Sequence, residues 1–261
     1  MPEVLEVESY RLLAERVVGA TIAKGWSDGY AAKKLLSSAQ WARTVKGLTI
    51  TSTGRRGKLM LLETDGVRLG MRFGMTGVLL IDSTAGIDGL FYGPHTYRAD
   101  WIRAGLELAD GRRLLLHDPR RLARVEIDPD LAALGPDALG LTRAQFDAML
   151  DIARGEGPAI KARLLDQSVV AGVGNLLGDE ILFRAGIDPR TPTARLSASQ
   201  RSALYKSFTQ TMRTLQRRGG SHLGDHMPGR FPSGICPRDA APMRVAVIGG
   251  RTTYWCSLHQ K

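Results

Sequence analysis

The sequence predicts a two-domain α+β protein: an N-terminal antiparallel β-sandwich with flanking helices, then a helical domain that ends in a β-hairpin. Between residues 47 and 127, short apolar runs are separated by Gly, Asp and basic residues, which is typical of antiparallel strands joined by tight turns. From 141 to about 218 the composition becomes helical, with capping-box signals at Thr142 with Gln145 and Ser197 with Gln200.

The first expected element is a helix over residues 3–20, because Leu5, Leu12, Leu13 and Val17 recur at helical spacing. Expected strands follow within "GLTITST", "KLMLLET", "VRLGMRF" and "TGVLLID". Residues 127–140 carry Pro, Asp and Gly at short intervals, which indicates a linker. The domain boundaries that we expect are 1–130 for the sandwich, 131–140 for the linker, 141–220 for the helical domain and 221–261 for the last segment.

That last segment contains a loop and a hairpin. Residues 219–234 hold too much Gly and Pro for regular structure. Residues 244–255 are two short apolar runs around Gly249-Gly250, a sequence typical of a hairpin turn.

The charge balance points to a polyanionic partner. Lys and Arg outnumber Asp and Glu by 36 to 26, a formal net charge of +10, and nucleic acid is the commonest partner of so basic a chain. An anionic membrane is the alternative, but we find no polybasic amphipathic helix, no lipidation signal and no apolar run near the roughly 20 residues of a membrane span. We therefore expect a cytoplasmic monomer, associated with the nucleoid in a bacterium, whose two cysteines form no disulfide framework.

The segment "AGVGNLLGDE" contains Gly172, Gly174 and Gly178 at the G-x-G-x-x-G spacing of dinucleotide-binding loops. The residues before it have helical composition rather than strand composition, and no acid follows about 20 residues later, so a dinucleotide site is disfavoured. We expect a turn between two helices, where free N–H groups face a phosphate of nucleic acid. Asn175 is the candidate helix cap and phosphate contact.

Four other segments accompany that turn: "MPEVLEVE" at the start, "GRRGK" ending at Lys58, "HDPRR" ending at Arg121 and "RTTYWC" ending at Cys256. With "DQSVVAGVGNLLGDE" they resemble, in order and over nearly the whole length, the formamidopyrimidine-DNA glycosylase / endonuclease VIII family. The resemblance implies a helix-two-turn-helix domain, a zinc-finger-like hairpin and a basic cleft for double-stranded DNA with damaged bases or abasic sites. It also implies a bifunctional DNA glycosylase/AP lyase of base-excision repair that cleaves the strand by β,δ-elimination, without a redox or nucleotide cofactor.

The resemblance assigns the chemistry to Pro2, Glu3, Lys58 and Arg251. Removal of the initiator Met would leave Pro2 with a secondary amine of pKa about 8, which can attack the sugar C1′ and form a covalent iminium. Glu3 would be the general acid/base, supported by Glu6, while Lys58 and Arg251 would approach phosphates. The alternatives are structural: a proline that only starts a helix, a surface glutamate that favours the helix dipole, a turn lysine and a surface arginine of the hairpin.

Met75, Arg120 and Leu122 match three positions whose side chains fill the gap left by a flipped base. Leu122 departs from the pattern, since the formamidopyrimidine branch usually has Phe there. Arg121 would contact phosphates. For Met75 the alternative is a residue of a core strand.

The sequence allows more than one preferred lesion. Lys161 matches a residue of the lesion pocket, with a helix-surface lysine as the alternative, and Leu177 stands where relatives carry Tyr. The loop after Ser221 is shorter than in relatives that close over 8-oxoguanine. One alternative is an enzyme that prefers oxidised pyrimidines, as endonuclease VIII does, and another is an enzyme that acts chiefly as an abasic-site lyase. A DNA-binding protein without catalysis is disfavoured, because Pro2, Glu3 and Lys58 are all present.

Family members usually end in a four-cysteine zinc finger, but two of those positions differ here. The chain has Cys236-Pro-Arg-Asp239 and Cys256-Ser-Leu-His259, which keeps the spacing and replaces two cysteines by residues that also bind zinc. One hypothesis is a structural zinc site made by Cys236, Asp239, Cys256 and His259. The other is a metal-free hairpin.

Overall fold

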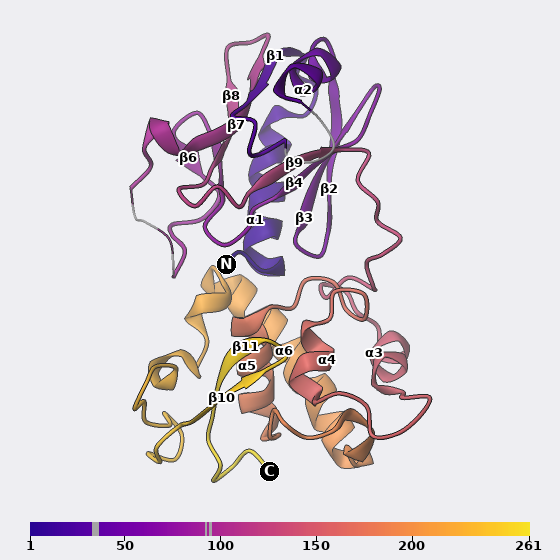
Figure 1. Ribbon diagram of the computed structural model, residues 1–261, viewed down its shortest axis with the longest axis vertical. Coiled ribbons are helices and arrows are strands. Elements are labelled where there is room, and N and C mark those ends of the chain that lie inside the picture. The colour runs from indigo at the N-terminus through magenta and orange to yellow at the C-terminus, as the bar shows by residue number, and fades with distance from the viewer. Residues whose placement is uncertain (33–36, 92, 94–95) are drawn as a thin grey trace. The chain divides into compact units, whose positions relative to one another are not determined.

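The computed structural model describes residues 1–32, 37–91, 93 and 96–261, and the chain divides into two compact units, Met1–Ala132 and Ala133–Lys261 (Figure 1). The division falls inside the expected linker 131–140. The Gly135 and Ala138 N–H groups donate to the Gln167 and Ala171 carbonyls at 2.9 Å each, so this end of the expected linker is an ordered part of the second unit. No helix among the described residues is both long and apolar enough to cross a bilayer.

The first unit is the expected antiparallel β-sandwich. One sheet has the order β1-β7-β8-β5-β6, and the other has the order β2-β3-β4-β9, with every neighbouring pair antiparallel. The strands are β1 (Ile22–Ser27), β2 (Ile50–Arg56), β3 (Leu59–Thr64), β4 (Leu69–Arg72), β5 (Val78–Ile81), β6 (Thr84–Ala85), β7 (Ile102–Leu108), β8 (Arg113–His117) and β9 (Arg124–Ile127).

The helix α1 (Val4–Ala14) contacts β2 and β3 of one sheet and β5 of the other, and its Val7, Tyr10 and Leu13 belong to the core. The prediction of a helix to residue 20 is wrong at its end. After Ala14 the chain tightens into a short 3₁₀ turn, η1 (Glu15–Val17), and then turns at Gly19 with φ +86°. Spacing alone could not show this, because Val17 is buried in either conformation.

Two elements of this unit were not predicted from the sequence, the strand β1 and the helix α2 (Ser38–Val45). Ser37 and Gln40 form a capping box that starts α2, and Trp41 and Val45 point into the core. A Cβ at Gly25 of β1 would lie 2.1 Å from Val45 Cγ2, so glycine is what lets the helix approach the strand. The short 3₁₀ turn η2 (Ala99–Trp101) precedes β7.

The second unit contains α3 (Arg143–Leu150), α4 (Ile160–Leu165), α5 (Asn175–Ala185) and α6 (Ala198–Arg218), with the 3₁₀ turn η3 (Thr193–Arg195) before α6. Thr142 and Ser197 accept from the Gln145 and Gln200 N–H groups, so both expected capping boxes are confirmed. The loop 219–234 contains only the 3₁₀ turns η4 (Ser221–Leu223) and η5 (Met227–Gly229).

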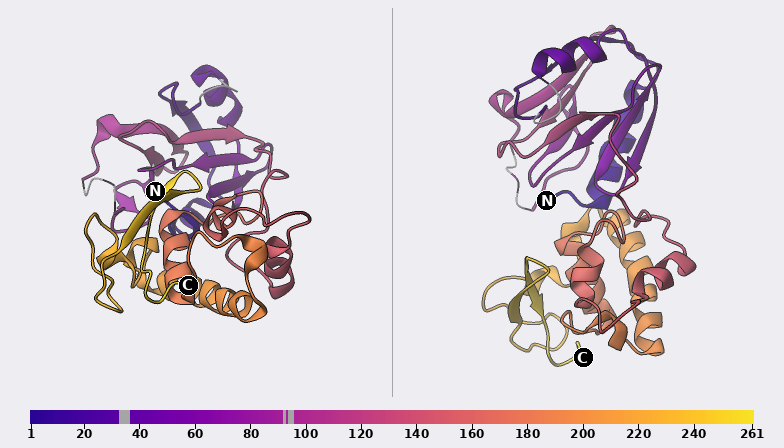
Figure 2. Two further views of the ribbon diagram at one scale, coloured as in Figure 1. Left: turned by 60° about the horizontal axis from the view of Figure 1, so that its bottom comes forward. Right: turned by 45° about the vertical axis from the view of Figure 1, so that its right-hand side comes forward.

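The predicted hairpin is also confirmed. Strands β10 (Arg244–Ile248) and β11 (Arg251–Trp255) pair in register, and Gly249 and Gly250 both have positive φ, +57° and +71°. Two successive positive φ values are what a tight two-residue hairpin turn requires. The hairpin lies beside α5 within this unit, as both views of Figure 2 show.

Candidate catalytic site and metal-ligand cluster

The first turn of α1 holds the two N-terminal glutamates. Glu3 is the N-cap residue, its N–H donates to Glu6 Oε2 at 2.8 Å, and its side chain accepts from the Glu6 N–H in return. Both side chains are buried, 1% exposed. The alternative of a surface glutamate at position 3 is therefore wrong, and the capping box fixes both carboxylates next to Pro2.

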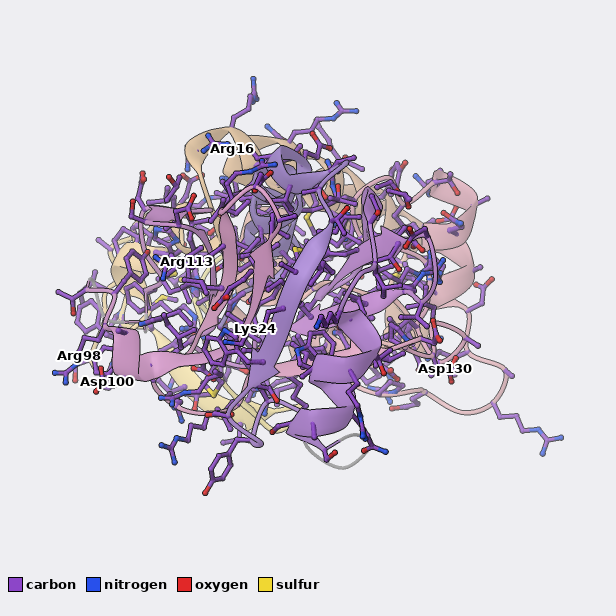
Figure 3. The ribbon with its side chains drawn as sticks, turned by 90° about the horizontal axis from the view of Figure 1, so that it is seen from above. Arg16, Lys24, Arg98, Asp100, Arg113 and Asp130 are labelled. Atoms are coloured by element: carbon purple, nitrogen blue, oxygen red, sulfur yellow. The ribbon has the colours of Figure 1, made fainter. Side chains whose placement is uncertain are left out.

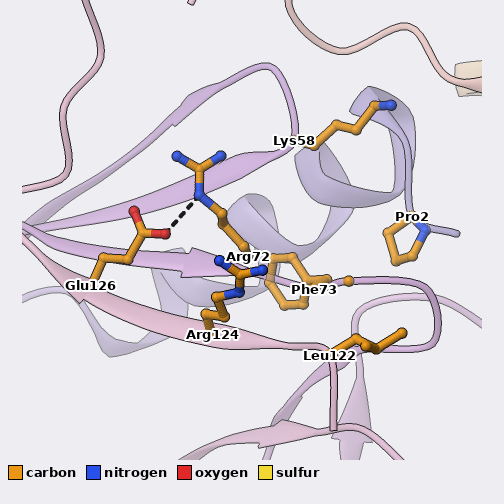
Figure 4. Close-up of a pocket in the computed structure, with 8 residues that line it drawn as sticks. Pro2, Lys58, Arg72, Phe73, Leu122, Arg124 and Glu126 are labelled. Carbon is orange, nitrogen blue, oxygen red and sulfur yellow. Dashed lines mark hydrogen bonds and ion pairs between the residues drawn. The ribbon is translucent and has the colours of Figure 1, made fainter. Parts of the chain in front are cut away.

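Pro2 and Lys58 line one cavity of about 540 Å³ (Figure 4). Lys58 lies in the two-residue turn between β2 and β3, after Gly57 with φ +56°. Arg55 ties that turn to α1, because its Nε lies 2.9 Å from Glu8 Oε2 and its Nη1 donates to the Gly57 carbonyl at 3.1 Å. The sheet and the helix thus bring together two side chains that lie 56 positions apart in the sequence (58 against 2).

The surroundings of the Met1 amine shift its pKa in the direction that favours the neutral form. Burial lowers the pKa of the N-terminal amine, and the charges of Lys58 and Arg120 lower it further, while Glu3 and Glu6 oppose these effects. A neutral amine is the nucleophilic form. When the initiator Met is removed, the amine becomes that of Pro2, which lines the same cavity.

Met75, Arg120 and Leu122 form an exposed group on two loops of the first unit. Met75 is 36% and Leu122 is 42% exposed, and Arg120 Nη1 lies 3.5 Å from Met75 Sδ. Gly74 (φ +58°) fits against Leu122, since a Cβ there would lie 2.6 Å from Leu122 Cβ. The alternative of a core residue for Met75 is wrong, because it sits in the turn between β4 and β5 and faces solvent.

Three further residues of this region were not expected from the sequence. Arg72 and Arg124 line the cavity with Pro2 and lie directly opposite each other on β4 and β9. Tyr30 has the Arg121 guanidinium 4.8 Å above its ring, and Arg121 itself has φ +55°. No local signal could have found these three, because strand pairing and loop contacts bring them to the site from distant segments.

In the second unit, Lys161 of α4 is fully buried. Its Nζ lies 2.5 Å from Asp179 Oδ1 and donates to Thr253 Oγ1 at 2.7 Å, while Arg230 Nε lies 2.9 Å from Asp179 Oδ2. Burial raises the pKa of the Asp179 carboxyl, and both cations oppose that shift. The helix-surface alternative for Lys161 is wrong, and within this unit its amine faces the interior rather than an open pocket.

Asn175 does not cap α5 as expected, since the N-cap is Gly174 and Asn175 is the first helical residue. Its Nδ2 donates to the Thr252 carbonyl at 3.1 Å, which joins the glycine-rich turn to the hairpin. Arg251, the neighbour of Thr252, is exposed, and its Nη1 donates to the Gly250 carbonyl at 3.2 Å. The structure therefore brings Asn175 and Arg251 to the same end of this unit.

Cys236, Asp239, Cys256 and His259 form one cluster that could hold a metal ion, with one ligand atom from each within 4.8 Å of the others. Asp239 Oδ2 lies 3.6 Å from Cys236 Sγ, 3.3 Å from Cys256 Sγ and in contact with His259 Nδ1. The hydrogen bond from His259 lowers the pKa of the Asp239 carboxyl, and burial raises the pKa of the Cys256 thiol.

Two family models match the chain. The formamidopyrimidine-DNA glycosylase N-terminal domain matches residues 1–125, and the formamidopyrimidine-DNA glycosylase H2TH domain matches residues 134–225. The chain is also similar to solved structures of the Lactococcus lactis Fpg protein, one in complex with FAPY-dG-containing DNA (TM-score 0.80, 23% identity) and one with abasic-site DNA (TM-score 0.79, 23% identity). These likenesses cover 99% of this chain, and 100% and 99% of the two solved chains. They confirm the two-domain fold.

Relatives named formamidopyrimidine-DNA glycosylase are similar over almost the full length. The Chloroflexus aurantiacus protein is 31% identical over 280 residues, 98% of this chain and 96% of the relative. The Thermus thermophilus protein is 32% identical over 283 residues, 98% of this chain and 97% of the relative. This chain belongs to the formamidopyrimidine-DNA glycosylase family.

Proposed function

We propose that this chain is a bifunctional DNA glycosylase/AP lyase that excises an oxidised base and then cleaves the strand at the abasic site. The observation that carries the proposal is the cavity that Pro2 and Lys58 share, next to the buried Glu3. The relatives' activity supports it, since they are named for glycosylase action on formamidopyrimidine-DNA.

The Pro2 nitrogen attacks C1′ of the damaged nucleotide. An N–C1′ bond forms, the glycosidic bond breaks with its electron pair leaving on the base, and the amine proton passes to that base. The nitrogen lone pair then breaks the C1′–O4′ bond, which opens the sugar ring and gives an iminium. Glu3 delivers a proton to O4′, and the carboxylate left by that transfer then takes the C2′ proton in the first elimination. Lys58 and Arg251 hold the flanking phosphates, which are the leaving groups of the two eliminations.

Double-stranded DNA is the proposed partner. Met75, Arg120 and Leu122 are exposed together, as side chains that fill a base-sized gap must be. Two cations on the face seen in Figure 3 are paired with acids instead: Arg98 makes two hydrogen bonds of 2.9 Å to Asp100, and Lys24 lies 3.9 Å from Glu107. We infer a cytoplasmic location from this proposed DNA substrate. One chain supplies every proposed residue, which is consistent with a monomer.

Zinc is the proposed metal of the Cys236, Asp239, Cys256 and His259 cluster. Bonds of 2.0–2.3 Å in a tetrahedral site put ligand atoms about 3.6 Å apart. The distances from Asp239 Oδ2 to the two sulfurs, 3.6 and 3.3 Å, and from Cys236 Sγ to His259 Nδ1, 3.9 Å, are close to that spacing. His259 Nδ1 and Asp239 Oδ2 are in hydrogen-bond contact instead, so these two side chains must move apart to hold the ion. Zinc bound there crosslinks the hairpin and contributes folding energy, with no part in the chemistry.

The test is covalent trapping. Labelled duplexes with formamidopyrimidine, 8-oxoguanine, dihydrouracil or an abasic site are incubated with protein and borohydride, and Pro2→Gly and Glu3→Gln serve as comparison variants. We expect a covalent protein–DNA band that Pro2→Gly abolishes, and the duplex that responds names the lesion. A covalent band with dihydrouracil alone would support the alternative of an oxidised-pyrimidine glycosylase. A band with the abasic site alone would support an enzyme that is chiefly a lyase. Retarded DNA without a covalent band on any duplex would overturn the enzymatic proposal.

A further inference from the structure

Two loops carry the exposed side chains Met75, Arg120 and Leu122. Residues 73–77 connect β4 to β5, and residues 118–123 connect β8 to β9. Exposed side chains on loops are ordinarily mobile, whereas side chains that enter a base stack need a fixed position before DNA arrives. Some group must therefore hold the two loops together.

The Asp118 carboxylate is that group. It is fully buried, and each of its oxygens accepts two hydrogen bonds. Oδ1 accepts from Thr76 Oγ1 at 2.5 Å and the Arg120 N–H at 3.1 Å. Oδ2 accepts from the Leu122 N–H at 2.6 Å and the Ala123 N–H at 2.8 Å. One carboxylate thus ties Thr76, the neighbour of Met75, to the backbone of both Arg120 and Leu122.

The backbone of Asp118 is held just as firmly. Its N–H donates to the Trp101 carbonyl at 2.8 Å, and its carbonyl accepts from Arg103 Nε at 2.6 Å. Arg103 is itself 4% exposed and lies 3.5 Å from Asp28. The backbone of Asp118, directly after the end of β8, is therefore fixed, and its carboxylate holds the two loops in place.

We propose that Asp118 is a positioning residue for base extrusion, which acts through Met75, Arg120 and Leu122 without touching DNA. This rests on the proposed function. Hydrogen bonds to a carboxylate are about twice as strong as those between neutral groups, so an aspartate at position 118 suits this role better than a neutral side chain. An amide in its place presents an NH₂ group to donors on one side and breaks two of the four bonds.

The test compares Asp118→Asn with Asp128→Asn. Asp128 is a matched control, because its Oδ1 accepts the Arg68 N–H at 2.8 Å and it lies beyond the far end of the β4–β9 pairing, next to Leu69 and Ile127. Each protein is assayed on a lesion duplex under single-turnover conditions and on a single-stranded abasic oligonucleotide. Only the duplex requires a base to be unstacked, so the single strand reports the Pro2 chemistry alone.

We expect Asp118→Asn to lower base excision from the duplex about 10- to 100-fold, the equivalent of one or two lost charge-assisted hydrogen bonds, and to change single-strand cleavage less than about 2-fold. Asp128→Asn should show neither effect. 2-Aminopurine opposite the lesion should brighten on binding of the parent protein and less with Asp118→Asn.

Equal losses on both substrates would overturn the inference, because they would mean a general loss of folded protein. If Asp118→Asn does not fold, Thr76→Val removes one donor to the same carboxylate and Thr76→Ser restores it; equal duplex rates for these two would also overturn the inference. Failure of the parent protein to cleave either substrate would instead refute the proposed function, so the two failures are distinguishable.

Discussion

Replacing Arg124 by glutamine should make DNA binding less sensitive to salt. Arg124 lies exposed at the Pro2 cavity, directly opposite Arg72 across β4 and β9. Like charges in direct cross-strand register destabilise a sheet. Glu126 compensates only one of them, at 2.7 Å from Arg72 Nε, and within the described part of the chain the Arg124 guanidinium has no hydrogen-bond or ion-pair partner. A phosphate would compensate the second.

The size of the effect follows from counterion release. Each phosphate contact contributes a slope of about −0.9 to the dependence of log K on log salt for duplex DNA. Loss of one contact therefore makes the slope about 0.9 less steep, and from 50 to 200 mM salt the variant loses roughly 3.5-fold less affinity than the parent. Glu126→Gln should act in the opposite direction, because it frees Arg72 for a phosphate.

The assay is fluorescence anisotropy with a labelled abasic-analogue duplex at several salt concentrations, with Arg98→Gln as control. Arg98 is already paired with Asp100, so its removal should leave the slope unchanged. An unchanged slope in Arg124→Gln, or equal changes in Arg124→Gln and Arg98→Gln, would refute a phosphate contact at this position.

Three further predictions concern protonation and metal binding. Single-turnover cleavage of abasic DNA should rise with pH, with a midpoint below about 8, the ordinary pKa of a terminal amine. Pro2 is buried, as is the Met1 amine, whose pKa burial lowers, so the Pro2 amine exposed by removal of Met1 should shift in the same direction; a midpoint above 8 would contradict this. Burial also lowers the pKa of His226 to about 3, so the unfolded chain binds this proton below about 6.5 while the folded chain does not. As the pH is lowered from about 6.5 to 3, the free energy of unfolding should then fall by up to about 1.4 kcal/mol per pH unit. Urea titrations at several pH values should show this slope in the parent protein and a smaller slope in His226→Gln. Chelation should speed hydrogen exchange in the hairpin, and Asp239→Ala should lower the zinc content measured by mass spectrometry; a metal-free purified protein would contradict the zinc site.

Local sequence predicted the elements whose signals are local. The capping boxes at Thr142 and Ser197 and the Gly249-Gly250 turn are each complete within a few residues, and the structure has all three. The helix end after Ala14 was missed, because η1 buries Val17 just as a longer helix would. The spacing of apolar residues carries no information on where tertiary packing ends a helix.

The sequence by itself determined the fold class, the family and the residue types of the chemistry, because five short motifs in order carry that information. Only the tertiary structure decided which charges meet. It placed Lys58 with Pro2, buried Lys161 against Asp179, and gathered two loops around Asp118. The physical reason is that a carboxylate or an ammonium group has no fixed partner along an unfolded chain. Strand register and helix packing determine which charged groups come into contact when the core forms.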